Sequence, residues 1–232
     1  MLEKGMFDHP DSRDQRPPLP AEAAALLARL ERPASPPPPP LCPAQPLAFA
    51  RGRVHELTGT ARRTLATILA GAAQAEGPVF WLRPAWRNDR LCPQGLIGLA
   101  DPGALIMVDC PRAEDVLWCM EEALRAGCVA LVIAEFAVPP DLRQVRRLHL
   151  AAAEGLARST GGDHQNATLA PLGLLMADEA AEFRLAGVES RWALHPEVDS
   201  GDWRLARRHS RALPPAQWRL RLETGGVRID AA

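Results

Sequence analysis

The sequence predicts an α/β domain with a mostly parallel sheet flanked by helices, followed by a small β-rich C-terminal extension. Short β-rich runs alternate with helical runs from Gly52 onward, which is typical of βαβ units. The run Val129–Ala134 is uniformly apolar, as expected for a central strand that is covered on both faces. After Ala177 the helical runs stop, and the remaining segments alternate as β-strands do.

Three regions follow from this pattern. Residues 1–47 are expected to form a flexible, proline-rich arm with one short helix at Ala21–Leu30, whose apolar face suits docking onto the body or onto a partner. The five consecutive prolines Pro36–Pro40 favour an extended spacer, or a ligand for an aromatic groove. Residues 48–176 form the predicted α/β core, and residues 177–232 form the β-rich extension.

The core elements are placed by their periodicity and by their end signals. The helix that begins at Pro111 shows both, with Glu114 and Asp115 in its first turn and Gly127 after its end. The predicted helices are Arg63–Ala75, Pro111–Ala126 and Asp141–Ala157. The predicted strands are Arg53–Leu57, Val79–Leu82, a buried strand at Leu105–Val108, Val129–Ala134 and Leu169–Met176. In the extension, Glu189–Leu194 and Trp218–Leu222 alternate, and the latter forms a predicted hairpin with Val227–Ile229.

Composition excludes several classes of protein. The net charge of -1 gives no general attraction to nucleic acid or membrane, so any such contact must come from local clusters of charge. An apolar signal segment and a membrane-spanning run are both absent from the sequence, which indicates a cytoplasmic protein. The five cysteines form no Cys-x-x-Cys pair, and the six histidines show no metal-binding spacing, so we expect neither disulfides nor a metal site.

The loop after the first core strand is where an α/β sheet of this kind normally binds phosphate. A working phosphate-binding loop reads Gly-x-x-x-x-Gly-Lys-Ser/Thr, so that backbone N–H groups surround the phosphates while the lysine and hydroxyl hold phosphate and magnesium. Counted from Gly59, the second glycine position holds Thr64 and the lysine position holds Leu65. The motif therefore fails, and we expect neither a nucleotide cofactor nor catalysis.

The segment Gly52–Gly59 resembles the first core strand of RecA and the beginning of its phosphate loop, and Thr64–Ala66 resembles the start of the following RecA helix. The resemblance implies a RecA-like core with a degenerate site at Gly59, Thr60, Arg62, Arg63, Thr64 and Glu135. Anchored on the helix, the loop is about three residues short, and Arg62 and Arg63 replace the phosphate lysine and the magnesium hydroxyl. Glu135 falls on the strand that presents the acidic, magnesium-linked residue. Arg83 and Pro84 stand where RecA has its catalytic glutamate.

A narrower resemblance is to the ImuA family, a RecA-related group that has also been called SulA-like. It is carried by Gly52–Leu57, Arg112–Trp118 with Met120–Arg125, Asp141–Leu142 with Arg146–Ala152, and Trp218–Leu222. The motifs cover residues 52–176 well, the C-terminal part loosely and the N-terminal arm hardly at all. The resemblance implies a part in SOS-induced translesion synthesis, a form of DNA damage tolerance and mutagenesis, alongside ImuB and an error-prone replicative-type polymerase in a mutasome. RecA is a further partner that it suggests, and DNA is another, contacted directly or through the complex.

The degenerate loop leaves its charged residues open to more than one role. Arg62 and Arg63 lie at a helix N-terminus, where two cations oppose the helix dipole, so they should face solvent or an anion. That anion could be a nucleotide, a DNA phosphate or a partner's carboxylate. Glu135 is either a remaining acidic ligand, or a carboxylate that caps backbone amides or pairs with an arginine.

The segment from Trp203 to Leu222 has the clearest charge asymmetry, with no acidic residue before Glu223. Arginine next to tryptophan suits phosphate contact and base stacking, and it equally suits a protein interface or a solvated strand face. The candidate binding residues are Trp203, Arg204, Arg207, Arg208, Arg211, Trp218, Arg219 and Arg221.

Taken together, these features predict a non-catalytic, RecA-like accessory protein that assembles or regulates an ImuB and error-prone polymerase complex in the SOS response. Two rival functions remain. The first is a RecA-like or KaiC-like ATPase in DNA repair that binds nucleotide through Arg62, Arg63 and Glu135. The second is a SulA-like inhibitor of cell division, for which the sequence offers no discriminating motif.

Overall fold

The computed structural model describes residues 37–161, 170–177, 185–198, 200–223 and 226–231. The chain divides into two compact units, Met1–Pro37 and Pro38–Ala232, and the elements below belong to the second. The helix predicted at Ala21–Leu30 lies outside the described residues.

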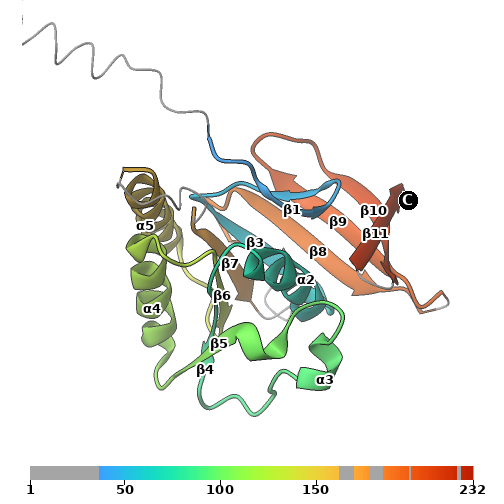
Figure 1. Ribbon diagram of the computed structural model, residues 1–232, viewed down its shortest axis with the longest axis horizontal. Helices are drawn as coiled ribbons and strands as arrows, with labels where there is room; N and C mark the ends of the chain where they lie inside the picture. The colour runs from blue at the N-terminus through green and yellow to red at the C-terminus, as the bar shows by residue number, and fades with distance from the viewer. Residues whose placement is uncertain (1–36, 162–169, 178–184, 199, 224–225, 232) are drawn as a thin grey trace, which may run out of the picture. The chain divides into compact units, whose positions relative to one another are not determined.

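Within the described residues, nine strands form one mixed sheet in the order β11-β10-β9-β8-β3-β7-β6-β4-β5 (Figure 1). The strands from β8 to β5 in this order are parallel, and β9, β10 and β11 extend the sheet in antiparallel fashion. The prediction of an α/β domain with a mostly parallel sheet is therefore confirmed. The parallel strands are β3 (Val54–Thr58), β4 (Val79–Pro84), β5 (Leu105–Cys110), β6 (Leu131–Phe136), β7 (Leu172–Ala177) and β8 (Ser190–Pro196). The antiparallel strands are β9 (Trp203–Ser210), β10 (Ala216–Glu223) and β11 (Gly226–Ala231).

Helices cover both faces of the parallel part of the sheet. On one face, α2 (Arg62–Gln74) and the hairpin of β1 (Leu41–Ala44) and β2 (Leu47–Phe49) bury one apolar core. On the other face, α4 (Ala113–Ala126) and α5 (Leu142–Gly161) pack side by side over a second core (Figure 1). Two short helical turns, α3 (Pro93–Leu96) and η1 (Pro102–Ala104), connect β4 to β5.

Glycine allows α4 and α5 to approach closely. A Cβ atom on Gly155 of α5 would lie 2.0 Å from the carbonyl oxygen of Leu124 in α4. Gly127 ends α4 in the left-handed conformation with φ of 69°, as its position in the sequence predicts. A Cβ there would lie 2.5 Å from the carbonyl oxygen of Gly155, so neither position has room for a side chain.

The structure differs from the sequence-based expectations in three places. The expectation that Leu105–Val108 is buried is wrong, because β5 is an edge strand on which Ile106 and Met107 are exposed. The hairpin of β1 and β2 spans the boundary expected at residue 47, and Leu41 and Leu47 are buried in the core. Strand β9 has no counterpart among the expected strands.

No helix in the described part of the chain has the length and apolar content needed to cross a membrane.

A buried histidine links the neighbouring parallel strands β3 and β8. The Nε2 of His55 in β3 lies 2.9 Å from the carbonyl oxygen of Ala50, so this nitrogen carries the proton. The other ring nitrogen, Nδ1, then accepts from the hydroxyl of Ser190 in β8 at 2.7 Å, and that hydroxyl oxygen accepts from Nε1 of Trp192 at 3.0 Å. The neutral ring thus satisfies every polar group in this chain of hydrogen bonds. Burial lowers the pKa of His55 to about 4.

This histidine makes stability depend on pH. An exposed histidine titrates near pH 6.5, so below that pH the unfolded chain takes up a proton that the folded chain refuses until about pH 4. The free energy of unfolding should therefore fall as the pH drops through this window, by up to roughly 3 kcal/mol. Burial also lowers the pKa of His149 to about 4, and this residue contributes in the same direction.

Urea denaturation at a series of pH values checks this prediction. A His55→Gln variant should lose part of the pH dependence between about pH 6.5 and 4, with His149 supplying the remainder. A matched His209→Gln variant, changed at an exposed position, should keep the wild-type dependence. Parallel curves for wild type and His55→Gln would show that His55 is not the linked group.

Candidate functional site

The loop after β3 is pressed against the neighbouring strand. Gly59 has a φ of 91°, a left-handed conformation that favours glycine. A Cβ atom at this position would lie 2.2 Å from the carbonyl oxygen of Leu194 in β8. The hydroxyl of Thr58 also donates to the carbonyl oxygen of Trp192 in the same strand, at 3.2 Å. The loop therefore lies directly on β8, and only glycine fits at residue 59.

The loop uses its own backbone donors within the protein. The N–H of Ala61 donates to the carbonyl oxygen of Leu194 at 3.0 Å, and the N–H of Arg62 donates to that of Gly59 at 3.2 Å. Nη1 of Arg62 lies 3.4 Å from the same Gly59 oxygen. A phosphate-binding loop needs successive N–H groups that point at the ligand. Two of the N–H groups in this short loop are engaged elsewhere.

Arg63, in the first turn of α2, forms a two-pronged ion pair with Glu135 at the end of β6. Its Nε lies 3.1 Å from Oε1 of Glu135, and its Nη2 lies 2.6 Å from Oε2. Nη2 also contacts the carboxylate of Asp89 at 2.7 Å. Trp81 in β4 donates its indole N–H to Oε1 of Glu135 at 2.8 Å. Side chains from α2, β4 and β6 thus meet at one carboxylate, and we call this group the Arg63–Glu135 cluster.

The electrostatics of the Arg63–Glu135 cluster are those of a partly buried ion pair. Glu135 is only 5% exposed, and Trp81 is fully buried. Burial lowers the pKa of Arg63, but the hydrogen bonds and charges of Glu135 and Asp89 outweigh it and raise the pKa above its usual value. A carboxylate in such a place needs a cation nearby, because an unpaired buried charge is costly. Arg63 supplies that cation from within the chain.

The structure therefore brings together two of the residues that the sequence singles out as a degenerate nucleotide site. The sequence left Glu135 either as an acidic ligand or as a carboxylate that caps amides or pairs with an arginine, and in the structure it pairs with Arg63. The anion that Arg63 contacts is therefore a carboxylate of the same chain. Thr60 is exposed and Thr64 is half-buried. No sequence signal pointed to Trp81 or Asp89, which complete the cluster.

A second cation lies at the end of β4. Arg83 is 2% exposed, and its Nε donates to Oδ1 of Asp109 in β5 at 2.6 Å. Its Nη1 donates to the carbonyl oxygen of Arg87 at 3.2 Å. The hydrogen bond from Arg83 holds the pKa of Asp109 below its usual range. The edge next to Glu135 thus carries a buried arginine where the resemblance would place a catalytic carboxylate.

The C-terminal candidate residues divide into buried and exposed groups. Arg207 is 7% exposed, and its guanidinium contacts two indoles, 5.5 Å from the ring centroid of Trp192 and 5.1 Å from that of Trp218. The two rings are stacked with their centroids 5.7 Å apart. Arg207 also donates to the carbonyl oxygen of Pro214 at 3.0 Å. This arginine and Trp218 hold the sheet together, as cation–π pairs do in packed regions. Trp203 is half-buried beside the same core.

The remaining arginines of this segment are partly neutralised by the fold. Acidic residues that are distant in sequence lie beside three of them: Glu189 beside Arg211, Glu197 and Asp202 beside Arg219, and Asp202 and Asp230 beside Arg221. Arg204 and Arg208 are exposed and have no ion-pair partner among the described residues. The strong basic character seen along the sequence is therefore reduced on the folded surface.

Comparison with known proteins adds no assignment. No family model matches the sequence, and no curated protein matches it significantly. Among the described residues, no three histidine, cysteine, aspartate or glutamate side chains gather in a way that could hold a metal ion.

The Arg63–Glu135 cluster gives a prediction about stability. An Arg63→Met variant should lower the free energy of unfolding by about 3 kcal/mol, because it leaves a buried carboxylate without a cation. In an Arg63→Met/Glu135→Gln double variant most of this loss should be recovered, since the amide still accepts from Trp81 and carries no charge. Urea denaturation at neutral pH measures both.

Arg90→Met is the matched control. The side chain of Arg90 is 67% exposed and pairs with Asp109 at 3.4 Å, so its loss should change stability by less than about 1 kcal/mol. If Arg63→Met cost no more than this control, the ion pair with Glu135 would not be a stabilising element of the fold.

Proposed function

We propose that this chain is a non-catalytic, RecA-like accessory protein of SOS-induced translesion synthesis. In this proposal it helps to assemble or regulate a complex of an ImuB-like protein with an error-prone replicative-type polymerase. The observation that carries the non-catalytic part is the two-pronged contact between Arg63 and Glu135. The assignment to translesion synthesis rests on the resemblance of its sequence motifs to those of the ImuA family.

The position of the ion pair explains why we infer a former nucleotide site. Ligands of open α/β sheets bind beyond the carboxyl ends of the strands. The loop after β3 and the end of β6 lie at that edge, separated only by β7. Glu135 therefore lies where a magnesium-linked carboxylate would be useful. The guanidinium of Arg63 already occupies its two oxygens.

Three features argue against nucleotide hydrolysis at this edge. A magnesium ion would have to displace Arg63 from Glu135, and arginine itself cannot coordinate the ion. Donors at Ala61 and Arg62, which a phosphate would need, are bonded to backbone carbonyls. Arg83, at the end of β4, offers a cation in place of a water-activating base. Together these features favour a scaffold that has kept the fold without the chemistry.

A genetic complementation experiment tests the proposal. Deletion of the gene should reduce damage-induced mutagenesis to the uninduced level, and the wild-type gene should restore it. The Arg63→Met/Glu135→Gln double variant, which removes both charges together, should restore it equally well if the site has no catalytic role. A Glu135→Gln variant that folded normally but failed to complement would instead favour the rival ATPase.

Partner capture provides the second half of the test. The tagged full-length chain, purified from damage-treated cells, should bring down an ImuB-like protein or an error-prone polymerase. If deletion left induced mutagenesis intact and no such partner were captured, the proposed function would be wrong.

A further inference from the structure

The strand at one edge of the sheet lacks the usual protection against pairing. Strand β5 pairs with β4, and its other side forms the edge of the sheet. Ile106 and Met107, whose side chains point to opposite faces, are 45% and 44% exposed. Natural edge strands are commonly blocked by lysine, proline or a bulge. The one charged residue of β5 is Asp109, which is already paired with Arg83. As far as the described residues go, no strand pairs with the outer side of β5, so that side can accept another strand.

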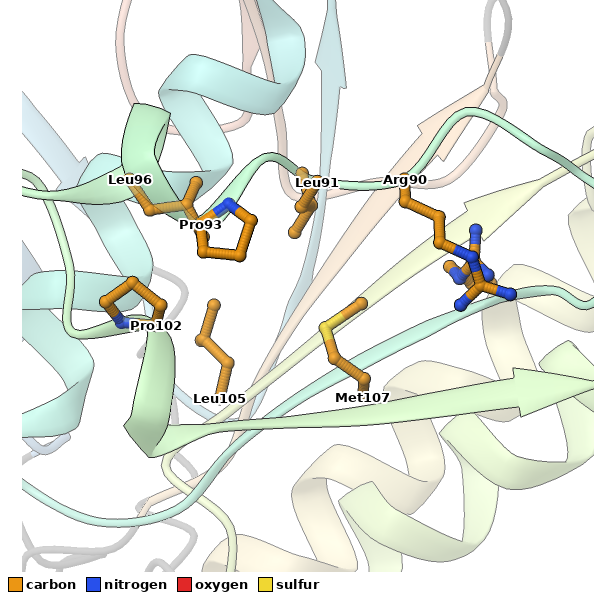
Figure 2. A pocket seen from close by; sticks show the side chains of 8 residues that line it. Arg90, Leu91, Pro93, Leu96, Pro102, Leu105 and Met107 are labelled. Carbon is orange, nitrogen blue, oxygen red and sulfur yellow. The ribbon is translucent and has the colours of Figure 1, made fainter.

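An apolar pocket lies beside this edge. It has a volume of about 150 Å³, room for one large side chain. Figure 2 shows its apolar wall, formed by Leu91, Pro93, Leu96, Pro102, Leu105 and Met107. Leu105 and Met107 come from β5 itself, and α3 and η1 supply three of the others. A strand added along β5 would place every second side chain on the face that carries this pocket.

One end of the pocket is cationic and short of acceptors. Arg83 and Arg90 both line it, and both bond to a single carboxylate, that of Asp109, at 2.6 and 3.4 Å. Although Arg83 is only 2% exposed, its Nη2 has no hydrogen-bond partner within the described part of the chain. Buried arginine donors are normally all satisfied. The side chain of Arg90 is 67% exposed at the rim. Two guanidinium groups that share one carboxylate favour a second anion at this end.

We propose that β5 and this pocket form a docking surface for an extended, acidic segment of a partner protein. The segment adds to the sheet as a strand along β5 and inserts a bulky apolar side chain between α3 and Met107. A neighbouring aspartate or glutamate of the segment meets the exposed guanidinium of Arg90 at the rim, beside the buried Arg83. Backbone hydrogen bonds supply affinity and the pocket supplies specificity, as in other cases of strand addition. The surface stands apart from the proposed function, because its chemistry requires neither a polymerase nor DNA.

Charge favours a different protein over a second copy of this chain. Two β5 strands paired with each other would supply no new carboxylate to the arginines, because Asp109 is already bonded to both of them. The opposite edge, β11, carries one acidic residue, Asp230, and its carboxylate accepts from Arg228 of the same strand at 3.1 Å. Neither edge strand of the described sheet offers the unpaired acid that the pocket lacks.

Peptide selection against the full-length protein tests the proposal. A displayed library of random short peptides should yield binders that share a bulky apolar residue next to aspartate or glutamate. Fluorescence polarisation with a labelled selected peptide should show binding weakened at least about tenfold by Met107→Glu and by Arg90→Glu. The matched controls are Leu213→Glu, at an exposed position between β9 and β10, and Arg143→Glu, at an exposed position on α5. Both should bind the peptide as the wild type does.

Each other outcome overturns the proposal. Peptides that bind Met107→Glu and the wild type equally well would be bound at a surface other than β5. A selection that yields no binder would show that the β5 edge does not accept strands. A dimer in sedimentation velocity that Met107→Glu converts to monomer would assign the edge to self-association. Arg90→Glu keeps the test decisive if Met107→Glu perturbs the fold, because Arg90 lies at the rim and its side chain is mostly solvated.

Discussion

The ion pair between Arg63 and Glu135 is the constraint on which this end of the sheet depends. A carboxylate that is 5% exposed at the end of a central strand needs a cation, and α2 supplies it from its first turn. The same carboxylate accepts from Trp81, so α2, β4 and β6 are fixed to one another through it. Two arginines at a helix N-terminus would oppose the helix dipole, and Glu135 and Asp89 offset that cost for Arg63.

Most of the parallel core could be predicted from sequence, because each strand and helix there has a clear period and clear end signals. The failures have physical causes. The apolar run Leu105–Val108 is typical of a buried strand, but exposure at a sheet edge depends on strand order, which local sequence does not contain. Strand β1 contains Pro43, and proline is uncommon within strands. Strand β9 contains three arginines, which break the apolar alternation by which a strand is predicted. One of these, Arg207, is buried against Trp192 and Trp218.

The candidate site was only half predictable. The sequence singles out Arg63 and Glu135 separately, but these residues are 72 positions apart, and the spacing says nothing of their contact. The shortness of the loop is visible in the sequence, whereas its consequence, the close approach of Gly59 to Leu194, depends on where β8 lies. The positive charge of the C-terminal segment can also be seen in the sequence. Its neutralisation by acidic residues cannot, because residues such as Asp202 come close to the arginines only when the strands pair.

In the function proposed above, the chain fills its former phosphate site with its own side chains and backbone. Isothermal titration of the full-length protein with ATP and magnesium tests this most directly, with Arg62→Ala as the variant and Arg204→Ala as the matched control. We predict no saturable heat for any of the three proteins at concentrations up to about 1 mM, the weak end of specific binding. Saturable binding by the wild type and the control that vanishes in Arg62→Ala would contradict the proposal.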